Sequence, residues 1–457
     1  MAPRAEETMS DTFKAEARGA LLEGDRYLAF LAIVLLGYAL NGRAFAYLGF
    51  PPLYIGEISL LIGAIVFLRT GALVASLATL PSLMLVALMV WVVARTIPFV
   101  GVYGVDALRD STVVMYGGFA LIVIGLLLND ARRIDTVLRY YNVLLVSFPV
   151  ILVTFYLTLY WAEYIPSFYG SAPVVDITTS AVGTHLAGTM VFVLIGYRKV
   201  SFLWLLVWLA TLILVASTNR GATLAALVPI VFAMLMLGRL RLLTTAALAV
   251  VGIFAILLTV ESSLSSDDVA APNAPRVVSA HQIVKNAESM LGDSGDQNVE
   301  GTKRWRLDWW DIIINDTIYG PNFWTGRGFG LNLADADGYT GPAQGGPPTR
   351  NPHNVNMTLL ARAGVPGVVL WSLVVLSWGG MMLRAMLIAR SRGHKQWADL
   401  FLFIICYLTS ILINAFVDVT LEGPMQGIWF WCLFGFGIGS VMVYRAQGAG
   451  EGGSSRR

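Results

Sequence analysis

Arg220 is the first residue in this chain whose type and setting could serve chemistry. It lies in the sequence Ser-Thr-Asn-Arg-Gly-Ala at residues 217–222, a very short turn between two apolar runs. An arginine at membrane depth is costly, so its presence there favours a function, and a guanidinium suits an anionic ligand. The alternative is a long side chain that only reaches headgroup phosphates. The sequence leaves both interpretations open.

A second group of cations lies at the start of a predicted helix. Lys303, Arg304 and Arg306 stand among three tryptophans in residues 303–310. Arginine binds phosphate oxygens through two parallel hydrogen bonds, and the positive end of a helix dipole strengthens that attraction. An interfacial helix whose cations contact lipid phosphates would have the same pattern. This alternative has most weight for Lys303 and Arg304.

Two of the four histidines have settings that favour a role. His353 lies between Pro352 and Asn354, where the chain re-enters an apolar run soon after Arg350. A neutral imidazole near pH 7 can accept a proton from a hydroxyl, although a histidine in such a turn also occurs without any function. His185 opens another apolar run, where it either packs against a neighbouring helix or lines the same cavity.

Metal and nucleotide sites are not indicated. No two His or Cys residues have the spacing of metal ligands, and Asp335 and Asp337 form a lone acidic pair, for which Mg²⁺ bridging is the less favoured interpretation. Residues 326–330 read Gly-Arg-Gly-Phe-Gly, but no predicted strand precedes them. Cys406 and Cys432 lie in separate apolar runs and are expected to be packing residues. We expect no cofactor and no metal.

Composition places these side chains in a membrane protein. Hydrophobic residues make up 56% of the 457-residue chain and charged residues 13%, whereas soluble domains average about 25% charged residues. The net charge of +2 is too small to indicate a nucleic-acid partner. A membrane-spanning helix needs about 20 mostly apolar residues. We predict twelve such runs, near residues 27–47, 53–68, 82–100, 111–128, 137–160, 181–197, 201–217, 221–237, 242–260, 366–389, 398–416 and 426–444.

Lys and Arg segregate between alternate connections, which predicts the orientation. One set of short connections holds Arg69, Arg132, Arg133, Arg198, Lys199, Arg239, Arg241, Arg390, Arg392 and Lys395. The opposite short connections hold only Arg43, Arg95, Arg109 and Arg220. Because the basic set is normally cytoplasmic, both termini should be cytoplasmic, with the long connection on the opposite, non-cytoplasmic side.

The expected fold is therefore all-α and polytopic, with about twelve transmembrane helices and one large, partly helical loop on the non-cytoplasmic side. The long loop carries aromatic residues that argue against simple disorder, and a loop of this length is usually functional. The organisation that we predict is a cytoplasmic tail at 1–26, transmembrane helices 1–9 at 27–260, the large loop at 261–354, transmembrane helices 10–12 at 355–444 and a second cytoplasmic tail at 445–457.

Taken in order, the short motifs resemble those of the O-antigen ligase and polymerase family of bacterial membrane glycosyltransferases. The matching segments are residues 217–222, 306–310, 326–330, 353–354 and 364–367. The resemblance covers about residues 180–380, and the ordered set is more specific than any single motif. Two departures occur: Thr218 and Asn219 stand where relatives often carry serines, and a longer Gly/Pro-rich insert precedes His353.

The resemblance implies a GT-C-like fold in a bacterial inner membrane, with the large, partly helical loop at 261–354 as a periplasmic loop. It also implies a metal-independent, inverting transfer of a glycan from an undecaprenyl-diphosphate carrier. Arg220 and Arg306 would bind the diphosphate, and His353 would activate the acceptor hydroxyl. Arg304 could take the role of Arg306 instead, because the cluster of basic residues makes the alignment with the family ambiguous by two positions. We also count Lys303, Asn354, His185 and Arg350 as candidate substrate-binding residues.

Several functions remain open at this point. Ligation to lipid A–core is slightly favoured over polymerisation of repeat units, and transfer to a protein is a third possibility. A transporter of lipid-linked sugars would normally place ionisable residues near the middle of several spans, where Glu57 is the main candidate. A non-catalytic scaffold would not need Arg220, Arg306 and His353 to converge. The partners expected are the lipid-linked donor, the acceptor and the bilayer, and not a nucleic acid.

Overall fold

The computed structural model describes residues 3–169, 172–242, 297–339 and 350–454, with a few isolated positions between 243 and 259. The chain is a helical bundle with two very short hairpins, β1 (Gly49–Phe50) with β2 (Leu53–Tyr54), and β3 (Ser167–Tyr169) with β4 (Ala172–Pro173). The first half of the bundle contains α1 (Pro3–Asn41), α2 (Arg43–Ala46), α3 (Ile55–Arg69), α4 (Leu73–Ser76), α5 (Leu80–Tyr103), α6 (Val105–Met115), α7 (Gly117–Asn129), α8 (Arg133–Tyr160) and the 3₁₀ turn η1 (Ala162–Tyr164).

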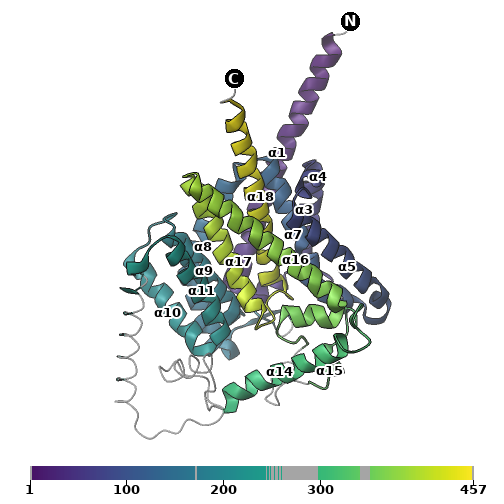
Figure 1. The fold of residues 1–457 in the computed structure, drawn as a ribbon, viewed down its shortest axis with the longest axis vertical. Coiled ribbons are helices and arrows are strands. Elements are labelled where there is room, and N and C mark those ends of the chain that lie inside the picture. The colour runs from purple at the N-terminus through teal and green to yellow at the C-terminus, as the bar shows by residue number, and fades with distance from the viewer. Residues whose placement is uncertain are drawn as a thin grey trace.

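The remaining helices follow after the second hairpin. They are α9 (Thr179–Leu194), α10 (Phe202–Thr218), α11 (Arg220–Met236), α14 (Gln297–Thr317), α15 (Leu333–Ala336), α16 (Val355–Ser391), α17 (Lys395–Ala415) and α18 (Pro424–Ser454). Figure 1 shows the outer ends of α1 and α18 projecting from one end of the bundle, with α14 and α15 lying across the other end. Both chain ends are therefore on the side opposite the segment that carries Arg306.

The apolar helices make this a multi-pass membrane protein. Among the described residues, α5, α8, α16, α17 and α18 are long and apolar enough to cross a membrane, and α6 with α7 adds a sixth span if that bent pair is counted as one. The helices α9, α10 and α11 are apolar but shorter. Helices lie at each predicted run except 242–260, most of which is outside the described residues. The total of twelve spans stays a prediction.

The segment that crosses the lower end in Figure 1 has a small core of its own. Trp309 and Ile313 of α14 pack with Leu333 of α15 and with Leu360 and Ala361 of α16. All five side chains are buried at 5% exposure or less, which corresponds to roughly 1.5–3 kcal/mol for each large apolar side chain removed from water. We call this unit of α14, α15 and the start of α16 the cap.

A break in α16 separates the cap from the long membrane part of that helix. Gly364 has φ +71°, which only glycine adopts easily, and a Cβ there would lie 2.7 Å from the carbonyl oxygen of Phe323. The backbone of Gly326 also approaches Gly364, since a Cβ added at residue 326 would lie 2.6 Å from the amide nitrogen of Gly364. The glycines at 326 and 364 thus allow two backbones to touch where α16 bends.

Candidate functional site

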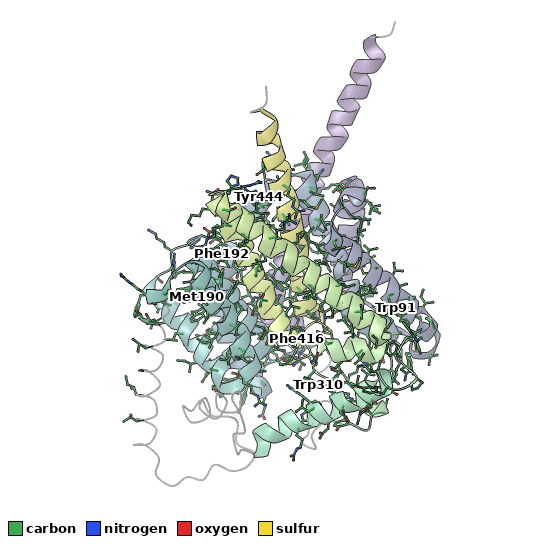
Figure 2. The ribbon with its side chains drawn as sticks, in the orientation of Figure 1. Trp91, Met190, Phe192, Trp310, Phe416 and Tyr444 are labelled. Atoms are coloured by element: carbon green, nitrogen blue, oxygen red, sulfur yellow. The ribbon has the colours of Figure 1, made fainter. Side chains whose placement is uncertain are left out.

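Three of the residues singled out in the sequence are connected by the loop at 416–423, between α17 and α18. Its residues Val417 and Asp418 are consecutive, and each contacts one of the candidates. Figure 2 shows Phe416, at the start of this loop, at the same end of the molecule as Trp310 of α14. The loop therefore joins the membrane helices to the cap.

Arg306 lies against this loop. Its Nη1 donates to the carbonyl oxygen of Val417 at 2.9 Å, and its Cζ is 5.7 Å from the ring centroid of Trp305. Its Nε is buried and has no hydrogen-bond partner among the described residues. Burial lowers the pKa of Arg306, and the nearby charges act in opposite directions: Asp418 raises this pKa and Arg220 lowers it.

His353 meets the next residue of the loop. Its Nδ1 lies 3.2 Å from Oδ1 of Asp418, and its ring meets the edge of Trp305 at 5.7 Å. Burial opposes ionisation of Asp418, but the hydrogen bond and the charge of His353 hold the pKa of that carboxyl below its usual value. Asp418 is therefore an anionic partner for one side of the imidazole.

The backbone around His353 is fixed in an unusual conformation. His353 has φ +54°, and it is the sole residue other than glycine with a positive φ in the described part of the chain. Such a conformation costs on the order of 1–3 kcal/mol and persists only where the surroundings hold it. Trp310 provides one such contact, donating from Nε1 to the carbonyl oxygen of Pro352 at 2.7 Å. The helix that carries Arg306 thus also positions His353.

Arg220 reaches the same neighbourhood from the membrane helices. It is the first residue of α11, and Asn219 caps that helix by accepting from the amide of Ala222 at 3.1 Å. A Cβ at Gly221 would lie only 2.6 Å from Cγ2 of Val417, so the 219–222 turn packs directly on the loop. The electrostatic effect of Arg220 on Arg306 agrees with this proximity.

The other predicted residues occupy different settings. Arg304 is exposed on α14. Lys303 lies in the same helix, with its side chain outside the described residues. Asn354 caps α16, its Oδ1 accepting from the amides of Asn356 and Met357. His185 is buried in α9, with Nδ1 2.7 Å from the hydroxyl of Tyr407.

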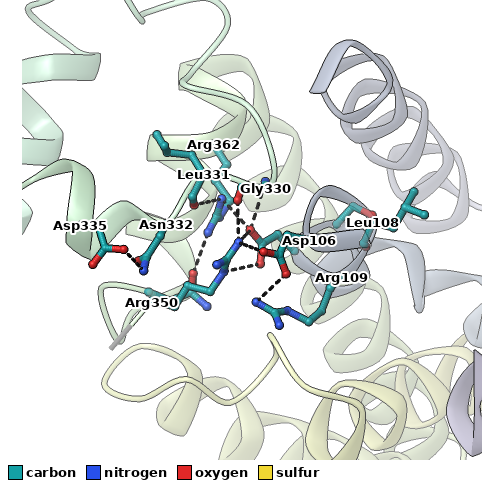
Figure 3. Close-up of polar contacts among 12 residues, drawn as sticks. Asp106, Leu108, Arg109, Gly330, Leu331, Asn332, Asp335, Arg350 and Arg362 are labelled. Atoms are coloured by element: carbon teal, nitrogen blue, oxygen red, sulfur yellow. Dashed lines mark hydrogen bonds and ion pairs between the residues drawn. The ribbon is translucent and has the colours of Figure 1, made fainter. Parts of the chain in front are cut away.

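Arg350 belongs to a compact ionic network around Asp110 (Figure 3). Its Nη2 lies 3.1 Å from Oδ2 of Asp110 and donates to the carbonyl oxygen of Gly330 at 2.6 Å. The fully buried Arg362 contacts the same carboxylate at 3.0 Å and donates to the carbonyl oxygen of Leu331. Asp110 also accepts from the amide of Gly330. These bonds fasten the cap to α6.

The glycine-rich stretch 326–330 is used in packing. Arg327 pairs with Asp337 at 2.6 Å and with Asp316 at 3.1 Å. Asp337 also accepts from Nε1 of Trp309 at 2.7 Å, whereas Asp335 accepts from Asn332. Both oxygens of Asp337 are therefore engaged by protein groups. Among the described residues, no three His, Cys, Asp or Glu side chains are grouped as metal ligands would be.

Asp418 and Glu422 are two residues of this region that sequence reasoning did not single out. Glu422 Oε1 accepts from Oγ1 of Thr358 at 2.9 Å, and its Oε2 is buried with no partner among the described residues. Burial raises the pKa of Glu422 to about 7. One feature of the sequence could have indicated these two acids. Residues 416–423 form a predicted outer connection that contains two acidic residues and no Lys or Arg.

Comparison with known proteins agrees with the motifs. The model of a family described as O-antigen ligase matches residues 205–372, a range that contains Arg220, Arg306 and His353 and ends before Asp418. No curated protein matches the chain. The match confirms the resemblance inferred from the sequence over residues 205–372, less than half of the chain, and supports a membrane enzyme of the O-antigen ligase and polymerase type.

Proposed function

We propose that the protein transfers a glycan from undecaprenyl-diphosphate to an acceptor hydroxyl, as an O-antigen ligase acting on lipid A–core or a similar acceptor. The observation that carries this proposal is the meeting of Arg306 and His353 on the consecutive residues Val417 and Asp418, with Arg220 close enough to contribute to the lowered pKa of Arg306. Two guanidiniums beside one imidazole suit a diphosphate leaving group and a hydroxyl nucleophile.

His353 would act as the general base. With its Nδ1–H donating to Asp418, the other ring nitrogen, Nε2, is left with a lone pair for the acceptor hydroxyl. The hydroxyl oxygen attacks the anomeric carbon while its proton passes to Nε2. Asp418 then stabilises the imidazolium that forms, so it is a positioning residue and does not itself take the proton.

Arg220 and Arg306 would bind the diphosphate. As the bond from the anomeric carbon to the diphosphate oxygen breaks, negative charge accumulates on the leaving group, and fixed guanidiniums neutralise it without a metal. The buried, unpartnered Nε of Arg306 is one donor that can serve this purpose. Attack opposite to the leaving group inverts the anomeric centre. Between the two aligned candidates, the setting of Arg306 favours it over the exposed Arg304.

The membrane setting supports the same proposal. The lipid carrier requires a site next to the bilayer, and the loop at 416–423 lies between two helices long enough to span it. We place this end of the molecule on the periplasmic side of a bacterial inner membrane, with twelve spans and both termini cytoplasmic, because the basic connections gather at the other end. Arg350 and Asn354 would support the site by holding the chain on either side of His353.

Purified protein incubated with a lipid-diphosphate glycan and a lipid A–core acceptor would test this function. We expect a product that carries one added block, because a ligase transfers the glycan once. A ladder of products without added acceptor would indicate the alternative, a repeat-unit polymerase. The Asp418→Asn variant should have a lower kcat with little change in the KM of the donor, since it acts through His353. Unchanged turnover in this variant would contradict the role given to Asp418.

A further inference from the structure

A second polar region lies at the opposite end of the bundle, where α16 ends and α17 meets α18. Tyr444, labelled at that end in Figure 2, lines two hollows of about 320 and 370 Å³. The smaller is lined by Ala385, Ile388, Arg392, Tyr444, Arg445 and Gly448, and the larger by Gly393, His394, Lys395, Gln396, Trp397, Tyr444, Gln447 and Gly448. None of these residues takes part in the proposed transfer.

The smaller hollow has an excess of positive charge. Arg392 and Arg445 both line it, and neither forms an ion pair within the described part of the chain. Lys395, in the adjacent hollow, is paired with Asp399 at 2.7 Å. Arg390 is also engaged, because its Nη1 caps α11 through the carbonyl oxygen of Met236 at 2.7 Å. Two guanidiniums of one hollow are thus available to a phosphate group.

The turn after Arg392 depends on a glycine. Gly393 has φ +74°, which lets the chain turn sharply after α16. Arg392 Nη1 lies near the backbone of α18, 3.6 Å from where a Cβ of residue 448 would be, which is an ordinary van der Waals distance. The guanidinium of Arg392 therefore lies next to α18 at Gly448.

The walls of the two hollows are typical of the membrane interface. The ring of Tyr444 packs against Trp397 at 5.4 Å, and its hydroxyl lies 3.0 Å from Nδ1 of His394. Tryptophan and tyrosine concentrate at the depth of lipid headgroups. Ala385 and Ile388 add an apolar floor toward the hydrocarbon. The site therefore offers two cations at headgroup depth and an apolar surface beneath them.

We propose that Arg392 and Arg445 bind the phosphate of an anionic phospholipid headgroup in the hollow between α16 and α18. Basic hollows between transmembrane helices suit such headgroups, and each nearby Lys or Arg adds attraction to anionic lipid. The glycerol and the upper part of the acyl chains lie on Ala385 and Ile388. Bound in this way, the lipid holds the projecting end of α18 against α16.

The test uses the full-length protein in detergent micelles, with bound lipid counted by native mass spectrometry. Phosphatidylglycerol and phosphatidylcholine with the same acyl chains are titrated separately, and glycerol phosphate is added as a soluble competitor. The Arg392→Gln/Arg445→Gln double variant is compared with Arg384→Gln, which removes one charge from an exposed position on α16 outside the hollow.

We expect the wild-type protein and Arg384→Gln to retain phosphatidylglycerol in preference to phosphatidylcholine. Affinity for phosphatidylglycerol should fall by about 10-fold or more in the double variant. Gly448→Glu should lower it as well, because its carboxylate would occupy the place of the phosphate. Equal retention of the two lipids, or undiminished phosphatidylglycerol binding by the double variant, would overturn the proposal. Displacement of the lipid by an equal concentration of glycerol phosphate would instead assign the hollow to a soluble phosphate.

Discussion

Two groups of arginines at the same end of the molecule differ in how their charges are compensated. Around Asp110, Arg350 and Arg362 share a buried carboxylate and also donate to backbone carbonyls. At the loop of residues 416–423, Arg306 donates to a carbonyl and retains a buried Nε without a partner in the described part of the chain.

The difference separates arginines that hold the fold from arginines that can bind an anion. A buried ion pair is most favourable when its remaining hydrogen bonds are also made. Arg350 and Arg362 pair with Asp110 and each donates to a backbone carbonyl, although Nε of Arg362, like that of Arg306, is buried with no partner among the described residues. A guanidinium without a close carboxylate partner can donate to phosphate oxygens at little cost. The presence or absence of a carboxylate partner therefore indicates the role of an arginine better than the distance of that arginine from a motif does.

Loss of the imidazole should have the largest effect on catalysis. His353→Asn should lower kcat by roughly 10²–10⁴, the usual contribution of a positioned general base. Asparagine tolerates a positive φ, so the melting temperature in detergent should change little. Transfer rates and thermal unfolding are measured on the same preparation. Activity close to that of the wild-type protein would exclude His353 as the base.

Replacement of Arg306 should be nearly as damaging. Arg306→Ala should lower the transfer rate on the order of 10²–10³, the usual effect of removing one donor from a developing charge. Arg304→Ala, a matched change two residues earlier on the exposed side of α14, should have a much smaller effect. Initial rates with saturating donor give the comparison. A larger loss in Arg304→Ala would transfer the diphosphate role to that residue.

Removing the carboxylate shared by Arg350 and Arg362 should lower the stability of the protein more than it changes glycan transfer. Asp110→Asn leaves the guanidinium of the fully buried Arg362 without its carboxylate, and loss of one partner in a buried pair costs about 3–5 kcal/mol. The melting temperature should fall, whereas the protein that remains folded should keep its KM for the donor. Asp311→Asn, on the exposed face of α14, is the control. An unchanged melting temperature would mean that the network contributes no net stability.

Glu422 should give a smaller, pH-dependent effect. Because burial raises its pKa to about 7 in the folded protein from the usual value of 4.5, the folded state holds a proton that the unfolded state releases between these values. Stability should therefore fall as pH rises from about 4.5 to 7. In Glu422→Gln this dependence should weaken, which melting curves at pH 5, 6, 7 and 8 would reveal. Parallel curves for the two proteins would contradict the raised pKa.

The sequence predicted the helices well because long apolar runs must form helices in a bilayer. The runs at 82–100, 137–160, 366–389, 398–416 and 426–444 all coincide with helices able to span a membrane. Boundaries were less predictable where a helix continues past its apolar part. The predicted tail at 1–26 and the first predicted run at 27–47 share one helix, α1, from Pro3 to Asn41, and the division at residue 26 stays a prediction.

The sequence predicted the cationic residues of the candidate site but not its anionic residues. Arg220, Arg306 and His353 stand out because polar residues beside apolar runs need a reason to be there. Asp418 does not stand out, since its role depends on a contact with His353 across 65 positions of sequence. The pairing of Arg350 with Asp110 spans 240 positions of sequence and could not be predicted either. Single-sequence patterns report local periodicity and carry no information on such distant pairs.

The break at Gly364 has a mechanical consequence for the proposed site. Helices that cross a bilayer change their tilt when the thickness of the hydrocarbon changes. In a straight α16, such a tilt would swing His353 at its leading end through a wide arc. With the helix interrupted at Gly364 and the leading segment bound to α14 and α15, tilting of the membrane part of α16 can be absorbed at the break. The imidazole and the guanidinium of Arg306 would then keep their spacing in membranes of different thickness.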